Sequence, residues 1–482
     1  MKAIIDIFYK INRLLLRGRA KAPCDAPDLL CTARKGEEAA TAMISEHKPY
    51  AAFASRDYRY FFAARLANSF GTNIMMPALG WQIYKLTRDP FALGMIGLAV
   101  FVPVVLSSLP AGEAADRLER RRVYQAAQVV LIGAALGFFT LTRAQVTAPW
   151  AFYLVAALFG AAKTFSMPTA TAWMPHLIPR EHFPNAVVWT SSTYQMSSVM
   201  GPAIVGATLY AFGEAFTYAL AAGCYFASLV LARMVRTRST GAGAPRRGLS
   251  QLFAGFTYIS RSRLILGATT LDLFALFLGG ATAMLPVYAY DVLHVGEVGF
   301  GLLRSAPALG SVATGILLAH RPLRRRVGRW MFVSVAAYGV TIVAFGLSRS
   351  LPLSVAVLVL LGAVETVGAF VRQTLIQLST HDDMRGRVTS VNMMFVSARN
   401  ELGDVQSGFA ASLLGIVPSV VIGGLCTVAV AGLWQWLFPA LRDVDSFDDA
   451  LPGHGPAARA SRPQPPEMIG ALAVEDVLEA KA

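Results

Sequence analysis

The sequence predicts an all-α membrane protein with twelve transmembrane helices in two pseudo-symmetric halves of six. Three observations support this: charged residues are scarce, long apolar stretches alternate with short polar clusters, and a weak repeat relates the halves. Of the 482 residues, 55% are hydrophobic and only 15% charged, whereas soluble domains carry about 25% charged residues. About 20 apolar residues span a bilayer as a helix, so the long stretches are interpreted as spans.

The spans divide the chain into five parts. A tail (1–55) precedes the first half (56–234), a linker (235–263) precedes the second half (264–440), and a second tail follows (441–482). The predicted spans are 59–84, 91–111, 123–143, 149–172, 185–212, 214–234, 264–290, 298–319, 329–347, 352–377, 388–416 and 419–439.

The tails and the linker differ in character. In the first tail, apolar residues recur at helical spacing with basic residues between them, as in a helix lying on an anionic membrane surface. The alternative to such a surface helix is that translation starts at Met43 and the residues before it are not made. The linker is predicted to carry a short surface helix around 252–259. The second tail is rich in Pro, Ala and acidic residues, so we expect it to be disordered.

The distribution of basic residues predicts the orientation. Nineteen arginines fall in loops on one side of the predicted spans, and four basic residues fall on the other: Lys85, Arg88, Arg143 and Arg349. Short cytoplasmic loops are enriched in Lys and Arg. We therefore expect both termini and the linker in the cytoplasm, and the chain in a bacterial inner membrane.

The net charge of +14 does not indicate nucleic-acid binding, because the basic residues lie between apolar stretches without interleaved aromatic residues. The four cysteines lack metal-ligand spacing, although Cys24 and Cys31 leave a metal or redox role open. The histidines are scattered and no phosphate-binding loop is present. We therefore expect no cofactor and no metal, a monomer, and as partners membrane lipids, protons and a small-molecule substrate.

A faint internal repeat supports two related halves. Residues 185–206 align without gaps on residues 387–408, an offset of 202. The glycine pairs Gly201/Gly403 and Gly206/Gly408 coincide. Parallel repeats of this kind occur in large secondary transporters.

The most specific motif lies between the second and third predicted spans, where Gly112, Asp116, Arg117, Arg120 and Arg121 follow one another in a short loop. A glycine lets two helices approach closely, and an acid four residues later can accept hydrogen bonds from a helix N-terminus or an arginine. An ordinary positively charged loop would not require this order.

In this motif the chain resembles the major facilitator superfamily, and the resemblance covers about residues 56–440. It implies a transporter and makes the loop a conformational switch. Glu119 stands where the family often has glycine. The matching loop 319–326 keeps the basic residues without the aspartate, so an acid-dependent latch is expected in the first half alone.

Two further segments resemble the branch of the superfamily that contains the bacterial enterobactin exporter. They are residues 80–90, with Gly80-Trp81-Gln82-Ile83-Tyr84, Leu86-Thr87 and Asp89-Pro90, and residues 271–274, with Leu271-Asp272-Leu273-Phe274. That branch implies efflux, with proton antiport as the usual energy source.

Residues Gly201, Pro202 and Gly206 partly resemble the glycine-proline motif of superfamily antiporters. That motif kinks the helix and seals one side, but Thr193 and Ser197 replace glycines of the full pattern. A plain proline kink is the alternative.

Ionisable residues within the spans are the candidates for proton coupling or for lining the substrate cavity, because each is costly in lipid and should face the protein interior. On a helical wheel Glu401 and Asp404 share one face with Ser390, Met394, Ser397 and Gly408, while Arg399 points to the opposite face. A structural polar network is the alternative. The full set is Arg65, Lys163, Asp272, Arg304, Glu365, Arg372, Arg399, Glu401 and Asp404.

The other acids carry separate expectations. Asp272 has no basic partner nearby in the sequence, which suggests that it lines a cavity wall. Glu365 and Arg372 share a face but lie two turns apart, too far for a direct ion pair. Lys163 and Arg65 are interpreted as counter-ions for the other half or as groups that attract anions.

These features favour a proton-coupled exporter of a small solute such as a siderophore or drug. An importer on the same fold remains an alternative. A membrane-embedded enzyme would need a clustered catalytic set at one interface, and the sequence has none. A non-transporting receptor or scaffold does not explain the loop motif or the charges in both halves.

Overall fold

The computed structural model describes residues 50–237, 239, 249–321, 323 and 325–450. The predicted surface helix of the first tail and the possible start at Met43 lie outside these residues. The helices are α3 (Arg56–Thr87), α4 (Pro90–Arg117), α5 (Arg120–Arg143), α6 (Pro149–Trp173), α7 (Phe183–Met234), α8 (Leu249–Arg261), α9 (Arg263–Leu278), α10 (Leu285–Val287), α11 (Gly296–His320), α12 (Val327–Leu347), α13 (Leu351–Ser379), α14 (Asp382–Leu414), α15 (Ile416–Leu437) and α16 (Pro439–Arg442).

Local sequence signals set several helix boundaries. Asp89 caps α4 by accepting a hydrogen bond from the Phe91 amide at 2.9 Å, and Pro90 occupies the first helical position. Gly213 interrupts α7 with a φ of 79°, a value that glycine adopts at little cost. The interruption falls between the predicted spans 185–212 and 214–234.

Nine helical segments of the described chain are long and apolar enough to cross a membrane. The helices α3 and α14 are not among them, although they have 32 and 33 residues. In α14 the reason is its charged residues, among them Arg399, Glu401 and Asp404. The coarse prediction of an all-helical membrane protein is confirmed.

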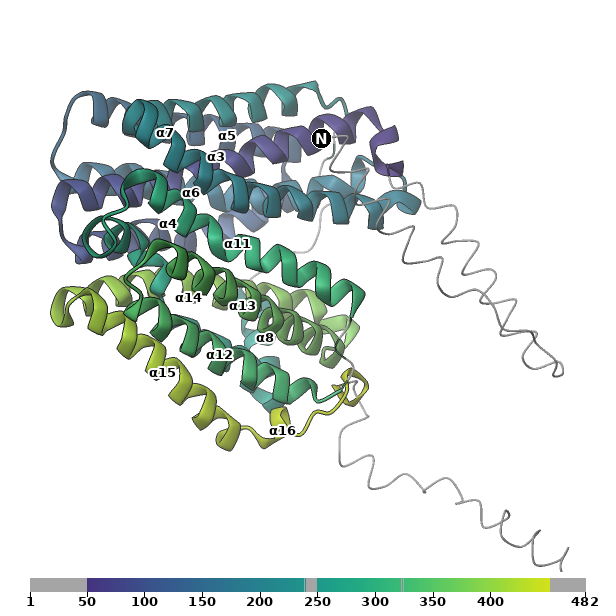
Figure 1. The fold of residues 1–482 in the computed structure, drawn as a ribbon. Coiled ribbons are helices and arrows are strands. Elements are labelled where there is room, and N and C mark those ends of the chain that lie inside the picture. The colour runs from purple at the N-terminus through teal and green to yellow at the C-terminus, as the bar shows by residue number, and fades with distance from the viewer. Residues whose placement is uncertain (1–49, 238, 240–248, 322, 324, 451–482) are drawn as a thin grey trace, which may run out of the picture. The chain divides into compact units, whose positions relative to one another are not determined.

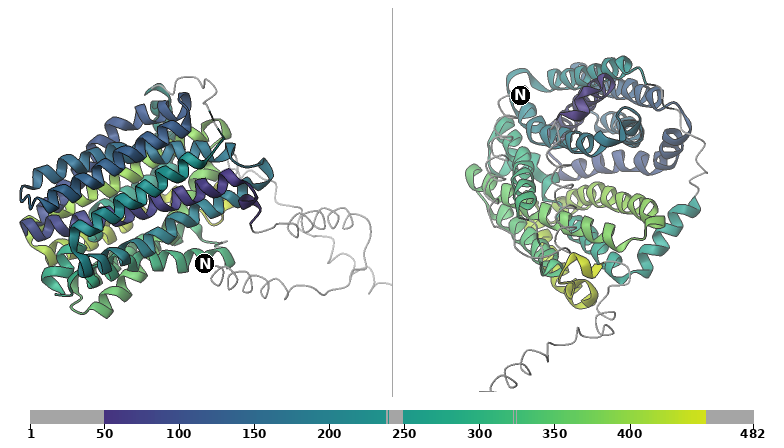
Figure 2. Two further views of the ribbon diagram at one scale, coloured as in Figure 1. Left: turned by 90° about the horizontal axis from the view of Figure 1, so that it is seen from above. Right: turned by 90° about the vertical axis from the view of Figure 1, so that its right-hand side faces the viewer.

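The helices pack in two groups, which Figure 1 and Figure 2 show as purple-to-teal and green-to-yellow ribbons. Among α3 to α7, α3 packs on α7, and α4 and α5 pack on α6. Among α9 to α15, α11 packs on α13, α12 on α15, and α14 on α9. We call these the N-terminal and C-terminal helix groups. They meet where α4 contacts α14 and where α7 contacts α11.

The glycines of the internal repeat occupy matching places in these contacts. A Cβ atom on Gly206 would lie 2.9 Å from the Cα of Gly301 in α11, and one on Gly408 would lie 3.0 Å from the Cα of Gly94 in α4. Each helix pair therefore crosses at two facing glycines, which permit the closest approach of backbones.

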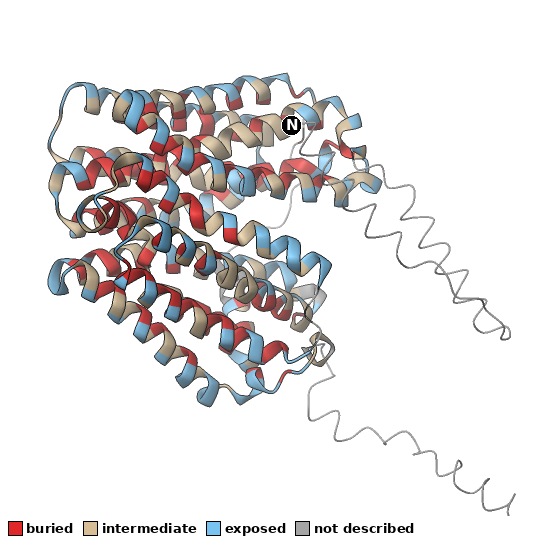
Figure 3. Ribbon diagram, viewed as in Figure 1, coloured by how far each residue is buried: buried red, intermediate tan, exposed pale blue. Residues whose placement is uncertain are grey.

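Close backbone approaches between the two helix groups are found at these crossings. We call the end of the bundle that carries loops 117–122 and 321–326 the arginine-rich end. Toward it, no described atom lies within 4 Å of a Cβ placed on Gly112 of α4, Gly315 of α11 or Gly386 of α14. Met394, two turns from Glu401, is 56% exposed. Buried residues in Figure 3 lie mainly inside each group and at the crossings.

The segments around the linker and after α15 are ordered where they are described. The helix α8 packs on α14, with Gly255 against the backbone of Arg387 and Ile259 buried. After α15, α16 and residues 443–450 fold back onto α12. The expected disorder from residue 441 therefore does not describe residues 441–450, and residues 451–482 lie outside the described part.

Candidate functional site

The paired acids of α14 lie at the contact with α4. A Cβ atom on Gly97 would lie 2.8 Å from the backbone oxygen of Glu401 and 3.2 Å from the Cβ of Asp404. Both acids are half-buried. The predicted shared face of Glu401, Asp404 and Gly408 thus becomes the face that meets the N-terminal helix group.

Two basic side chains act on this acid pair. The charge of Lys163 on α6 and that of Arg304 on α11 both reach Glu401. Arg304 also donates to the carbonyl oxygen of Thr282 at 3.1 Å. Lys163 comes from the N-terminal group and Arg304 from the C-terminal group. The interpretation of Lys163 as a counter-ion for the other half stays a prediction.

A second charge cluster lies inside the C-terminal helix group. Asp272 of α9 lies 2.5 Å from Nη1 of Arg399 and 3.3 Å from Nε of Arg372. Arg399 also lies 3.7 Å from the carboxylate of Glu365. Asp272 and both arginines are buried, with at most 9% exposed. The two arginines therefore balance the two acids within one apolar surrounding.

This cluster bears on three expectations from the sequence. Asp272 has no basic partner nearby in the sequence, as noted above, and α13 and α14 supply two arginines from distant positions. Arg399 faces away from Glu401, as the helical wheel predicted. Glu365 and Arg372 reach Arg399 and Asp272, respectively, rather than each other.

A small pocket opens beside the cluster, between α9, α12 and α13. Asp272, Glu365, Ser334 and Tyr338 are its polar lining. Arg372, on the other side of the cluster, donates to Oδ1 of Asn392 at 3.1 Å. Tyr338 and Asn392 were not predicted as site residues, because a neutral polar residue within a span is too common to stand out.

Arg65 of α3 lies apart from both clusters. The titratable side chains that act on it are Tyr58 and Tyr124. Its Nε atom is buried without a hydrogen-bond partner among the described residues. Among the described residues no ion pair joins Arg65 to the acids of α14.

The loop motif ties α4, α5 and α7 together at the arginine-rich end. Arg117 pairs with Glu113 at 2.7 Å, and Arg121 donates to the carbonyl oxygen of Arg233 at the end of α7. Arg120 donates to the carbonyl oxygen of Ala115 and, at 2.5 Å, to Oγ of Ser239. The motif arginines thus anchor the start of the linker.

Glu119 and Asp116 complete the loop. Glu119, the departure from the family pattern, pairs with Arg122 at 2.7 Å and directly precedes α5. Asp116 is half-buried at the end of α4.

The matching loop of the C-terminal group receives an acid from elsewhere in the chain. Asp445 accepts a hydrogen bond from the backbone amide of Arg326 at 3.2 Å, and its carbonyl oxygen accepts one from Val327. In the N-terminal group the carbonyl oxygen of Ser239 accepts from the amide of Arg120 in the same way. No local pattern around Asp445 could have indicated this role.

The glycine-proline motif lies at the crossing of α7 and α11. A Cβ on Gly301 would lie 2.8 Å from the carbonyl oxygen of Pro202, and one on Gly201 would lie 2.7 Å from the Cβ of Asn73 in α3. The non-helical backbone of α7 is at Gly213, eleven residues beyond Pro202. The motif therefore marks close helix packing.

Comparisons with known proteins agree with this architecture. A family described as transmembrane secretion effector, of the major facilitator superfamily, matches residues 47–460. The enterobactin exporter of Citrobacter koseri is 26% identical over 392 residues, covering 80% of this chain and 92% of that protein. The enterobactin exporter of Shigella boydii is 28% identical over 369 residues, covering 74% and 84%.

Solved transporter structures share the fold. A peptide transporter variant in complex with sulfate has a TM-score of 0.67 at 12% identity, covering 81% of this chain and 96% of its own. A bacterial homologue of the human lysosomal transporter Spinster, in an inward-facing and occupied conformation, has a TM-score of 0.64 at 14% identity, covering 81% and 97%.

Proposed function

Because the chain belongs to the transmembrane secretion effector family of the major facilitator superfamily, we propose that this multi-pass membrane transporter is a proton-coupled exporter of a small solute. The family consists of transporters and not of enzymes. Export is supported by the names of the relatives, which are enterobactin exporters. A siderophore is therefore the first substrate to test, followed by drugs.

We further propose twelve spans in two halves of six, with the termini in the cytoplasm of a bacterial inner membrane. Nine segments pass a length and hydropathy criterion. Dividing α7 at Gly213 makes ten, and adding α3 and α14 makes twelve. The arginine-rich end is then cytoplasmic, and we interpret the lack of close neighbours at Gly112, Gly315 and Gly386 as an inward-open state.

The observation that carries proton coupling is the position of Glu401 and Asp404. Acids at membrane depth are costly and mark ion or proton pathways. These two lie on the face of α14 that meets α4, with Lys163 of the N-terminal group acting on Glu401. A movement that separates α14 from α6 removes that cation from the acid pair.

The proposed cycle follows from this charge balance. The positive charges of Lys163 and Arg304 favour the ionised form of Glu401. When the cavity opens to the other side and the cation is withdrawn, a proton binds to relieve the repulsion between two close carboxylates. The Asp272 cluster is already balanced by two arginines, so we assign it a structural role. In the Asp272 cluster, Glu365 has an ion-pair contact with Arg399 at 3.7 Å. Because this contact is long, we propose that Glu365 is the acid of the cluster that can still bind a proton.

An accumulation experiment tests export and its energy source. Cells with and without the protein are loaded with enterobactin, and retained compound is measured with and without a protonophore. We expect lower retention in expressing cells, and the difference should vanish with the protonophore. Equal retention of enterobactin and of a panel of drugs would contradict export, and higher retention would identify an importer.

Single amide substitutions in proteoliposomes test the coupling residues. Glu401→Gln or Asp404→Asn should abolish transport driven by a pH gradient while passive exchange of substrate survives. Glu214→Gln, which breaks an exposed pair with Lys85 away from the switch loop, is the matched control and should transport normally. Full gradient-driven transport by the amide variants of Asp272, Glu365, Glu401 and Asp404 would show that the acids are structural.

A further inference from the structure

Arg65 of α3 carries a positive charge that no acidic side chain of the described chain balances. Among the other basic residues deep in the predicted spans, Lys163 and Arg304 both act on Glu401. The arginines of α13 and α14 lie beside Asp272. Within the described residues, Arg65 has neither an ion pair nor a hydrogen bond. A cation inside a membrane helix is costly and normally has such a partner.

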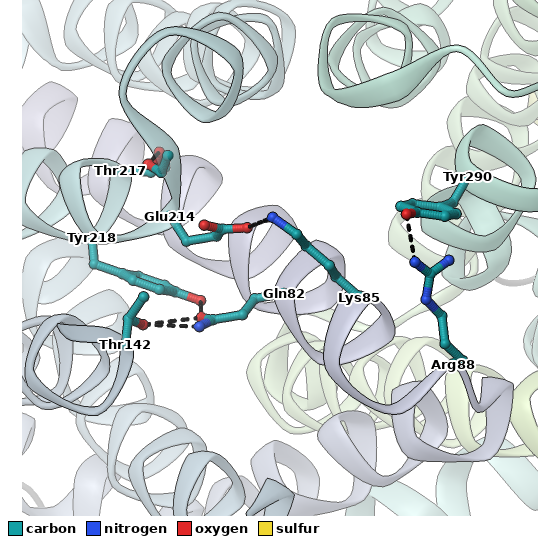
Figure 4. A network of polar contacts seen from close by, with 9 residues as sticks. Gln82, Lys85, Arg88, Thr142, Glu214, Thr217, Tyr218 and Tyr290 are labelled. Atoms are coloured by element: carbon teal, nitrogen blue, oxygen red, sulfur yellow. Dashed lines mark hydrogen bonds and ion pairs between the residues drawn. The ribbon is translucent and has the colours of Figure 1, made fainter. Parts of the chain in front are cut away.

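The opposite end of α3 shows how the same helix group holds its other polar side chains. Lys85 lies 2.6 Å from Oε1 of Glu214, and Figure 4 shows the two side chains reaching toward each other. Gln82 donates to Oγ1 of Thr142 at 3.0 Å, which Figure 4 also shows. Arg65 differs from these residues because nothing in its own helix group takes up its charge or its hydrogen bonds.

Three helices present polar side chains to one another beside Arg65. Asn68 follows Arg65 by one turn of α3, and its Oδ1 accepts a hydrogen bond from Nε2 of Gln128 in α5 at 3.0 Å. The same nitrogen lies 3.3 Å from Oγ of Ser166 in α6. Tyr124, one turn before Gln128, is close enough to act electrostatically on Arg65. We call these five residues the polar core of the N-terminal helix group.

Further donors next to the polar core are also unpaired. Nε of Arg65 is buried without a hydrogen-bond partner among the described residues, and so are Oγ1 of Thr169 and Nε1 of Trp173. Thr169 and Trp173 follow Ser166 by one and two turns on the same side of α6. The ring of Trp173 packs on that of Tyr124 with centroids 6.0 Å apart. Because buried donors are costly to leave unpaired, this arrangement fits a site that a ligand completes.

The charge of such a ligand follows from the acids of the N-terminal helix group. Those that the structure describes lie at helix ends, at the break in α7 or between helices: Asp57, Asp89, Glu113, Asp116, Glu119, Glu181 and Glu214. None of them therefore lies at the depth of Arg65, nine residues into α3. A guanidinium presents paired N–H donors whose spacing matches a planar carboxylate. An oxyanion is the ligand that would balance Arg65.

We propose that the polar core of the N-terminal helix group binds a planar oxyanion, such as a carboxylate, carried by the transported solute, with Arg65 as the binding cation. Arg65 as a whole is half-buried, so its guanidinium is not sealed off. The proposal rests on the proposed transport of a small solute and adds the charge of that solute. A neutral solute can also be exported, so failure of the anion site would leave export and proton coupling in place.

Binding of benzoate to the purified full-length protein in detergent tests the anion site. Benzamide has the same shape without the charge and is the matched probe. Isothermal titration calorimetry at neutral pH and fixed ionic strength should show that the wild type binds benzoate and not benzamide. Arg65→Gln should weaken benzoate binding about tenfold or more. Arg65→Lys keeps the charge without the paired donors and should weaken it less. No benzoate binding by the wild type, or equal binding of both probes, would overturn the site.

Lys85→Gln is the matched control variant, because it removes a cation of the same helix that already has an acidic partner. It should bind benzoate with wild-type affinity. Equal weakening by Lys85→Gln and Arg65→Gln would show that benzoate responds to the net charge of the N-terminal helix group, and the anion site would be wrong.

Melting temperatures separate a ligand site from a structural role of Arg65. An unpaired buried cation destabilises a fold, so Arg65→Gln should melt at the wild-type temperature or above it. Benzoate should raise the melting temperature of the wild type and not that of Arg65→Gln, because a ligand stabilises only the state that binds it. A lower melting temperature for Arg65→Gln with unchanged benzoate affinity would assign Arg65 to packing. Loss of enterobactin export in cells, with benzoate binding intact, would instead reject the exported solute and keep the anion site.

Discussion

Arg399 of α14 donates to Asp272 of α9, with Nη1 2.5 Å from Oδ2, across 127 positions of sequence. Both side chains are buried. Arg372 approaches the other carboxylate oxygen of Asp272, and Glu365 approaches the other nitrogen of Arg399. Asp272 is therefore the acid on which three helices, α9, α13 and α14, converge.

Removing this acid should destabilise the protein more than removing an exposed one. Asp272→Asn leaves two buried arginines with only Glu365, and breaking a buried pair costs about 3–5 kcal/mol. Glu214→Gln breaks the exposed pair with Lys85 and should cost about 0–1 kcal/mol. Thermal unfolding of the purified variants in detergent measures both. Similar melting temperatures would show that the Asp272 cluster does not stabilise the fold.

The orientation of Arg399 in this cluster could be predicted from the sequence, but its pairing with Asp272 could not. A helical wheel places Arg399 away from Glu401 because both lie on one helix with a known period. The pairing of Arg399 with Asp272 depends on which faces of α14 and α9 meet, and that follows from packing across distant parts of the chain. A single sequence carries no signal for such a pair.

Asp116→Asn should slow transport while expression stays near normal. The proposed latch acts between conformations, so its loss changes the rate and not the packing. We expect a loss of about tenfold, or roughly 1.4 kcal/mol in the barrier. Glu214→Gln removes an exposed pair with Lys85 away from the switch loop and should transport at the wild-type rate. Wild-type rates for Asp116→Asn would exclude the latch.

Cysteine labelling tests the orientation. A cysteine at Arg325, in the loop before α12, should react with an impermeant maleimide only after the cells are permeabilised. A cysteine at Arg349, between α12 and α13, should react in intact cells. The two sites flank one helix, so each controls for the accessibility of the other. The reverse pattern would show that the arginine count predicts the wrong side.

The fold was predictable where local patterns decide it. The helix boundaries follow apolar length, and the glycines of the repeat, such as Gly206 and Gly408, lie at equivalent crossings. The π-helical turn at Tyr288–Val292 was not predictable, because its residues Tyr290 and Asp291 suit an ordinary helix end. The role of Asp445 was not predictable either, since a composition rich in Pro, Ala and acids usually indicates disorder.

The open space around Gly112 leads to the last prediction. The motif glycine was expected to permit close helix approach, yet no described atom beyond its chain neighbours and its own helix backbone lies within 4 Å of a Cβ placed there. If α4 closes on its neighbour at the arginine-rich end only in the other state, Gly112→Val should leave the state seen here stable. The added side chain should then block closure and slow transport.

Gly133→Val in α5 is the matched control. Gly133 also has no described atom within 4 Å of its Cβ position, but it is exposed on the surface of the N-terminal group. Both variants should retain wild-type melting temperatures in detergent, and only Gly112→Val should lose transport in proteoliposomes. Equal transport by the two variants would mean that α4 does not approach another helix at Gly112 in either state. A lower melting temperature for Gly112→Val alone would place its close contact in the resting structure instead.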